Sequence, residues 1–130
     1  MERVSGKVVL LIEDHPAIRH LIAVVLDRPD VHLVFAGDGR AGLEAIDAHR
    51  PDLVLLDLLL PDINGWEVLE RIRGRRSMVD LPVLIVTAYG GDGDDGRAFE
   101  LGANGYLSKP FEPERLRGLV CDLLGGAVTV

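Results

Sequence analysis

A single carboxylate, Asp57, stands inside one of the most apolar stretches of the chain, residues 53–60. Burying an unpaired carboxylate costs several kcal/mol, and about 20 kcal/mol in the idealised limit, so Asp57 has to reach a surface or meet a positive partner. The aliphatic run before it is short and follows Arg50-Pro51-Asp52, which is typical of a buried parallel strand. We expect Asp57 to be the last residue of that strand, at the edge of the sheet where open α/β folds bind ligands.

Two other apolar runs end in polar residues in the same way. Residues 8–12 stop at Glu13 and Asp14, and residues 83–86 stop at Thr87. If these strands are parallel neighbours of the Asp57 strand, three carboxylates and a hydroxyl converge in one crevice. Carboxylates about 4 Å apart repel by roughly 4 kcal/mol at an effective dielectric of 20, and a bound cation would relieve that repulsion. Oxygen ligands favour Mg²⁺, Mn²⁺ or Ca²⁺ over zinc, and few carboxylates with room for water fit Mg²⁺ best.

Helical patterns separate the apolar runs. Asp14 is a possible cap for the first helix, with Pro16 in its first turn, and Asp38 is expected to cap the second. The patterns cover residues 18–26 (with Ile18, Leu21, Ile22, Val25 and Leu26 as the apolar repeat), 39–49, 66–73, 97–101 and 116–124, and further strands are expected at residues 32–35 and 105–107. Five strands alternating with five helices predict a parallel sheet covered on both faces and joined by right-handed crossovers.

The size and charge of the chain limit what it does. With 130 residues, 48% of them hydrophobic, we expect one globular domain over residues 1–130 with its core in residues 7–124. The net charge of −7 argues against direct binding to nucleic acid. Cys121 is the only cysteine, which excludes an internal disulfide and fits a reducing cytoplasm. The first seven residues lack the apolar core of a signal peptide, and no run reaches the length of a membrane span.

Short motifs stand at the carboxyl ends of the central strands. They are Glu13-Asp14, then Asp57 with Pro61 and Asn64-Gly65 beyond it, then Thr87-Ala88, and then the segment from Gly102 to Phe111, which contains Tyr106 and Lys109-Pro110. In this order and placement they resemble the receiver domain of two-component response regulators, of the single-domain type found in chemotaxis, across residues 7–124. The resemblance implies a doubly wound, flavodoxin-like fold of five βα units with strand order 2-1-3-4-5.

The resemblance also implies a role for each residue of the cluster. Asp57 accepts a phosphoryl group from a histidine of a sensor kinase or a phosphotransfer protein. Glu13, Asp14, Asp57 and the backbone carbonyl of Leu59 hold Mg²⁺, or Mn²⁺ in its place, and Lys109 supplies a second positive charge. Such a domain is a signalling phosphoacceptor and not an enzyme in the usual sense, because it catalyses only its own phosphorylation and dephosphorylation.

The family's conformational switch lies next to the phosphoacceptor. By the resemblance, the hydroxyl of Thr87, followed by Ala88, binds the phosphorylated form, and Tyr106 then turns inward. This changes the surface formed by the last helices and the last strand, residues 97–124, where a downstream output protein binds and where family members dimerise. The resemblance further implies a cis peptide bond between Lys109 and Pro110.

Two features depart from the family pattern. Leu59 and Tyr89 lie two residues after Asp57 and Thr87, where the family tunes dephosphorylation, and neither side chain can activate a water molecule, so we expect slow autohydrolysis. Residues 90–96 are all glycine or aspartate, which resembles one calcium-binding repeat but predicts a loosened helix instead, because each glycine costs about 1 kcal/mol of helix stability. We therefore expect a mobile output surface, or one that relies on the last helix.

Simpler readings and rival functions stand beside this one. Taken singly, Glu13-Asp14 is more often a helix cap with a solvated charge, and Lys109-Pro110 a plain loop. The four histidines (His15, His20, His32 and His49) lack the spacing of metal ligands and are interpreted as surface or core residues. The same fold also serves as an interaction module without phosphorylation. A doubly wound enzyme or flavin-binding domain is a third alternative, but the acids after the first strand would repel a phosphate unless a metal intervened.

Overall fold

The apolar runs form five strands, and the helical patterns between them form helices. The strands are β1 (Lys7–Ile12), β2 (Val31–Ala36), β3 (Leu53–Leu56), β4 (Val83–Thr87) and β5 (Gly105–Ser108), and the helices are α1 (Pro16–Val25), α2 (Gly39–His49), α3 (Gly65–Arg73), α4 (Asp94–Glu100) and α5 (Pro113–Leu123), with a 3₁₀ helix η1 (Arg76–Met78) after α3. This computed structural model describes residues 6–88 and 93–125. The strands form one parallel sheet in the order β2-β1-β3-β4-β5, so the predicted fold class is confirmed.

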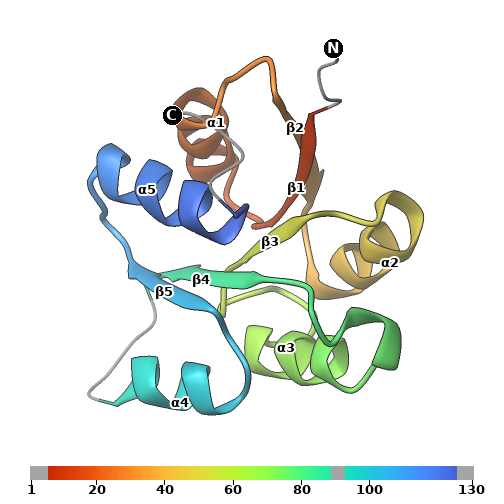
Figure 1. The fold of residues 1–130 in the computed structure, drawn as a ribbon. Helices are drawn as coiled ribbons and strands as arrows, with labels where there is room; N and C mark the ends of the chain where they lie inside the picture. The colour runs from red at the N-terminus through yellow and green to blue at the C-terminus, as the bar shows by residue number, and fades with distance from the viewer. Residues whose placement is uncertain (1–5, 89–92, 126–130) are drawn as a thin grey trace.

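Helices cover both faces of the sheet (Figure 1). One core cluster joins Leu10, Ile12, Val54 and Leu56 of the sheet to buried residues of α2 and α3. The other joins Val9, Leu11, Leu53 and Leu55 to buried residues of α1 and α5. Because successive strand residues point to opposite faces, strands buried on both sides have to be continuously apolar, and β3 is fully buried along its length.

The register of the strands brings the polar residues together. Ile12 pairs with Leu56, so Glu13 and Asp57 leave the sheet side by side. The backbone N–H of Asp57 still donates to the carbonyl of Ile12 at 3.1 Å, although β3 itself ends one residue earlier than expected, at Leu56. β4 reaches the same edge at Thr87.

Of the two predicted helix caps, Asp38 is confirmed and Asp14 is wrong, and the structure adds a third cap at Asn64. Asp38 caps α2 by accepting from the N–H of Ala41 at 2.7 Å, and Asn64 caps α3 by accepting from the N–H of Glu67 at 3.0 Å. Asp14 does not cap α1, because the helix begins one residue later than that prediction required. His15 holds the N-cap position without a capping side-chain bond, and Pro16 has no N–H that needs an acceptor.

The first helix also packs on a narrower apolar stripe than its repeat indicates. Ile22, Val25 and Leu26 are buried, whereas Leu21 is 42% exposed. Each helix residue rotates by about 100°, so Leu21 falls beside the stripe that faces the sheet and α5.

The fourth helix is short, and it begins inside the glycine and aspartate segment. Ala98 is the buried residue of α4, and the guanidinium of Arg97 lies 4.2 Å from the ring centroid of Trp66 on α3. Residues 90–92 of the segment lie outside the described residues, and the expected mobility of this surface stays a prediction. Among the helices of the described ranges, none combines the length and hydropathy that crossing a bilayer requires.

Candidate functional site

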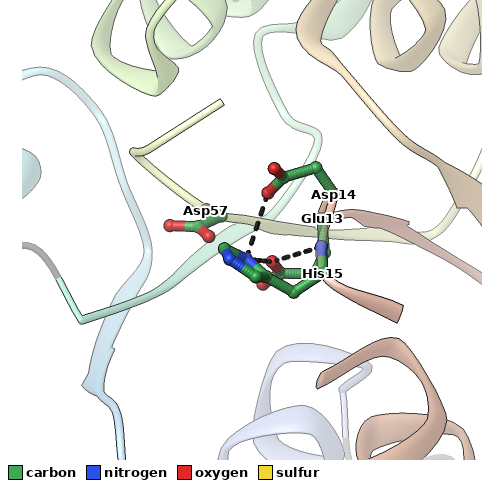
Figure 2. Close-up of side chains that lie close together, drawn as sticks. All are labelled: Glu13, Asp14, His15 and Asp57. Atoms are coloured by element: carbon green, nitrogen blue, oxygen red, sulfur yellow. Dashed lines mark hydrogen bonds and ion pairs between the residues drawn. The ribbon is translucent and has the colours of Figure 1, made fainter. Parts of the chain in front are cut away.

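Four side chains from two loops gather at the carboxyl edge of the central strands (Figure 2). Glu13, Asp14 and His15 come from the β1–α1 loop, and Asp57 follows β3. One potential ligand atom from each of the four lies within 4.8 Å of the others. The sequence prediction that the acids of different strands converge is therefore confirmed.

Asp57 is buried, and each of its carboxylate oxygens has a donor. The residue as a whole is only 3% exposed. Oδ1 accepts from the hydroxyl of Thr87 at 2.8 Å and from the backbone N–H of Leu59 at 3.1 Å, and Oδ2 accepts from Nζ of Lys109 at 3.1 Å. These bonds resolve the difficulty posed by the sequence, because a buried carboxylate is tolerated when donors and a positive charge face it.

Lys109 reaches the cluster from the β5–α5 loop and binds two carboxylates. Its Nζ lies 2.6 Å from Oε1 of Glu13 and 3.1 Å from Oδ2 of Asp57, and its side chain is 11% exposed. Its backbone N–H donates to the carbonyl of Thr87 at 2.9 Å, which fixes the loop to the end of β4. The peptide bond to Pro110 is cis, as the resemblance implied.

The cluster carries more negative than positive charge. Glu13, Asp14 and Asp57 contribute three carboxylates, and Lys109 contributes one ammonium. Oδ1 of Asp14 is buried and has no hydrogen-bond partner within the part of the chain that the structure describes. An orphaned buried oxygen beside two uncompensated charges fits a divalent cation with oxygen ligands.

The structure also describes most of the residues for which the resemblance implies a role in switching or dephosphorylation, and those roles stay predictions. Tyr106 on β5 pairs with Ile85, and its half-buried side chain packs against the core cluster shared with α2 and α3. Ala88 is exposed directly after Thr87. The side chain of Leu59 is exposed, although its backbone N–H binds Asp57. Tyr89 lies outside the described residues.

Sequence reasoning missed the part that His15 takes in this cluster. The residue is on the surface, as one of the two interpretations expected, but Nδ1 of its ring lies 3.1 Å from Oε2 of Glu13 and 3.3 Å from Oδ1 of Asp14. The signal in the sequence was that His15 directly follows the acid pair Glu13-Asp14, although the histidines lack the spacing of metal ligands.

It also missed Asp62, which anchors the loop that carries Asp57. Its two carboxylate oxygens accept from the backbone N–H groups of Gly39 at 2.8 Å and Arg40 at 2.9 Å, at the start of α2. Partial desolvation raises the pKa of Asp62, but the N–H donors of Arg40 and Gly39 outweigh it and lower the pKa to about 2. The loop after β3 is thereby tied to α2 as well as to α3.

Comparison with known proteins agrees with this geometry. The family model described as "Response regulator receiver domain" matches residues 9–120. The chain belongs to the response regulator receiver domains. Such domains are the signalling domains of two-component systems, and the comparison bears out both the resemblance and the fold.

Individual relatives place the receiver domain within larger regulators. The DNA-binding dual master transcriptional regulator RpaA of Synechocystis sp. is 38% identical over 116 residues, which cover 89% of this chain and 48% of RpaA. The chain thus spans about half the length of the curated relatives it matches.

Two solved structures of similar fold contain a bound divalent metal ion. The Mn²⁺-bound form of the response regulator Rcp1 has a TM-score of 0.84 and 31% identity, covering 96% of this receiver domain and 99% of Rcp1. The receiver domain of the sensor histidine kinase PA1611 from Pseudomonas aeruginosa PAO1, with magnesium in its active-site cleft, has a TM-score of 0.83 and 27% identity, covering 93% and 99%.

Proposed function

We propose that this receiver domain accepts a phosphoryl group on Asp57 from a phosphohistidine of a sensor kinase or phosphotransfer protein in a cytoplasmic phosphorelay. The observation that carries the proposal is the set of donors around Asp57. A carboxylate buried at the end of β3, with Thr87 and Lys109 on its two oxygens, sits where a covalent group would meet a hydroxyl and an ammonium. We further propose Mg²⁺, or Mn²⁺, as the cofactor.

The residues of the cluster divide the work of the transfer. An oxygen of Asp57 attacks phosphorus, the P–N bond of the phosphohistidine breaks, and the electron pair leaves with the imidazole nitrogen. Glu13, Asp14, Asp57 and the backbone carbonyl of Leu59 would hold the cation. A divalent cation, when bound, supplies positive charge to the phosphoryl oxygens. Lys109 already lies against Asp57, so its ammonium is in place to stabilise the charge that arrives.

Phosphorylation would change the surface of the last two βα units through Thr87. Its hydroxyl now donates to Asp57 and would have to turn to an oxygen of the phosphoryl group. Because the carbonyl of Thr87 accepts from the N–H of Lys109, a shift at the end of β4 is transmitted to the end of β5. Tyr106 would then turn inward, which alters the surface of α4, β5 and α5 that an output protein, or a second copy of the chain, would bind.

The test of the proposed function is phosphorylation by a small donor. Incubation with Mg²⁺ and acetyl phosphate should add one phosphoryl group to the wild-type protein, measured as intact mass. The adduct should be absent from the Asp57→Asn variant and from wild-type protein in EDTA, since the first lacks the nucleophile and the second lacks the cation. Asp80→Asn is the matched control, because Asp80 is exposed and far from the cluster in sequence, and it should be modified normally.

An unmodified wild-type protein would overturn the proposal. If that protein still bound a kinase or an output protein, the domain would act as an interaction module that uses the same fold without phosphorylation. Modification that persists in Asp57→Asn would place the phosphoryl group on another residue and would equally contradict the role of Asp57.

The Leu59→Asn variant is expected to lose its phosphoryl group faster than the wild type. The side chain of Leu59 is 51% exposed beside Asp57 and offers no hydrogen bond, whereas an amide there can hold a water molecule near phosphorus. We expect the half-life of the phosphorylated form to shorten by roughly tenfold. The measurement is the decay of the intact-mass adduct after the donor is removed. An equal half-life in both proteins would show that Leu59 does not limit hydrolysis.

Val79→Asn is the matched control for that variant. Val79 is a similarly exposed aliphatic residue that follows η1, before β4 begins, and its replacement should leave the half-life unchanged. We propose that Tyr89, like Leu59, slows hydrolysis of the phosphorylated form because its side chain cannot activate a water molecule.

A further inference from the structure

We propose that His15 is a nitrogen ligand of the divalent cation and that it shifts the metal preference of this receiver domain from Mg²⁺ toward transition-metal ions. The inference rests on the proposed function, because it concerns the same cation site. It adds a fifth protein group to the expected set of Glu13, Asp14, Asp57 and the carbonyl of Leu59.

The distances around His15 fit ligands that share one ion. Two atoms bound at about 2.1 Å to neighbouring positions of an octahedral ion lie about 3.0 Å apart. Nδ1 of His15 lies 3.1 Å from Oε2 of Glu13 and 3.3 Å from Oδ1 of Asp14, and Figure 2 shows its ring turned toward these acids. One potential ligand atom from each of Glu13, Asp14, His15 and Asp57 also lies within 4.8 Å of the others.

Hydrogen bonding alone leaves this arrangement incomplete. Nδ1 carries at most one proton, so it cannot satisfy an oxygen of Glu13 and an oxygen of Asp14 with two linear bonds. Oε2 of Glu13 already accepts from the backbone N–H of His15 at 3.1 Å, and Oε1 accepts from Lys109. Oδ1 of Asp14 remains buried and without a hydrogen bond among the residues that the structure describes. A cation placed between the three atoms would satisfy all of them at once.

The backbone holds His15 in this position. Its φ of −84° and ψ of 116° are extended, which is the conformation that a following proline favours. Pro16 then starts α1 directly, so the ring leaves the chain at a fixed point beside the acid pair. A preorganised ligand loses little conformational entropy when the ion binds.

A nitrogen ligand has a predictable effect on metal preference. Imidazole is a common ligand of transition-metal ions, whereas Mg²⁺ prefers oxygen ligands and keeps several waters. A site with only carboxylates and carbonyls discriminates less between these ions. The contribution of His15 to the binding affinity should therefore be large for Co²⁺ and small for Mg²⁺.

The first test is calorimetric titration of the unphosphorylated protein with CoCl₂ and, separately, with MgCl₂. The His15→Ala variant should lose about tenfold or more in Co²⁺ affinity and much less in Mg²⁺ affinity. His20→Ala is the matched control, since His20 is exposed on α1 and outside the cluster, and it should bind both ions as the wild type does. A fall of equal size for both ions would indicate that His15 only positions Glu13, and it would overturn the inference.

The second test detects the nitrogen directly. Pulsed electron paramagnetic resonance of the protein with substoichiometric Mn²⁺ should show coupling to ¹⁴N of an imidazole. The coupling should vanish in His15→Ala and in His15→Asn, although asparagine can still donate a hydrogen bond to Glu13. Absence of the coupling in Mn²⁺-loaded wild-type protein would overturn the inference. A protein that is phosphorylated with Mg²⁺ but lacks the coupling keeps the proposed function, whereas a protein that binds no divalent cation loses both.

Discussion

The Lys109→Met variant is expected to lose about 3 kcal/mol of its free energy of unfolding in metal-free buffer. The ammonium of Lys109 is the positive group that contacts both Glu13 and Asp57, and both carboxylates are buried. Methionine keeps most of the volume of the aliphatic stem but leaves three carboxylates facing one another. Removing one partner of a buried ion pair costs more than the pair contributes, because the remaining charge is left unpaired.

Added Mg²⁺ should recover part of this loss. In the wild type a bound cation and Lys109 would both compensate the same carboxylates, so removing Lys109 would leave the cation with more negative charge to neutralise. The variant should therefore bind Mg²⁺ more tightly than the wild type, and a ligand bound only by the folded state raises its free energy of unfolding with the logarithm of the ligand concentration divided by Kd. Urea denaturation in EDTA measures the stability lost in the variant, and the same measurement in millimolar Mg²⁺ measures the part that is recovered.

The control for this experiment is the Lys7→Met variant. It changes the net charge by the same amount at the start of β1, and Lys7 is not part of the cluster. Its stability should stay close to that of the wild type in both buffers. If Lys109→Met unfolds at the same urea concentration as Lys7→Met without metal, the ammonium is not what stabilises the buried carboxylates.

Much of the fold follows from local sequence patterns. The strands are short aliphatic runs, and the apolar residues of the helices between them recur at helical spacing. Asp38 and Asn64 cap the helices that follow them in the chain. Each of these features depends on residues a few positions apart. The position of Asp57 at the end of a strand could also be predicted from the sequence, because a carboxylate in an aliphatic run has few ways to avoid an unpaired charge.

The contacts that the sequence did not reveal join segments distant in the chain or depend on side-chain direction. Asp62 binds the start of α2, more than twenty residues before it, and Arg73 donates to the carbonyls of Gly102 and Met78 and to Oδ1 of Asn104. Asp14 was a reasonable cap by its position alone. Where α1 begins, and how His15 turns toward the acids, is decided by the packing of the β1–α1 loop, which periodicity does not specify.

The Gly65→Ala variant is expected to lower the free energy of unfolding by about 3 kcal/mol and to slow phosphorylation sharply. Gly65 is the first residue of α3, and it lies against the backbone of Asp57 and Leu58 in the loop after β3. A Cβ atom at this position would come within 2.5 Å of the carbonyl oxygen of Asp57 and of Cα of Leu58. These are backbone atoms, so the clash cannot be relieved by a change of side-chain rotamer.

Relief of the clash has to move either α3 or the loop that carries Asp57. The N–H of Gly65 donates to the carbonyl of Leu58 at 2.9 Å, so the two segments are bonded at the point where they would have to separate. A displacement of about 1 Å at a reacting group can reduce the rate by 10²-fold. We therefore expect the initial rate of phosphorylation by acetyl phosphate with Mg²⁺ to fall by at least about tenfold in Gly65→Ala.

Gly118→Ala separates this steric effect from the general effect of replacing glycine in a helix. Gly118 lies inside α5, and a Cβ atom there meets nothing within 4 Å. Alanine should raise the free energy of unfolding by about 0.5–1 kcal/mol at that position, because it forms helix better than glycine. In Gly118→Ala the stability measured by urea denaturation should therefore rise while the rate of adduct formation stays at the wild-type value, whereas both should fall in Gly65→Ala. Gly65→Ala with wild-type stability and rate would show that α3 can withdraw from Asp57 without cost, and the close contact would then have no part in holding Asp57 in position.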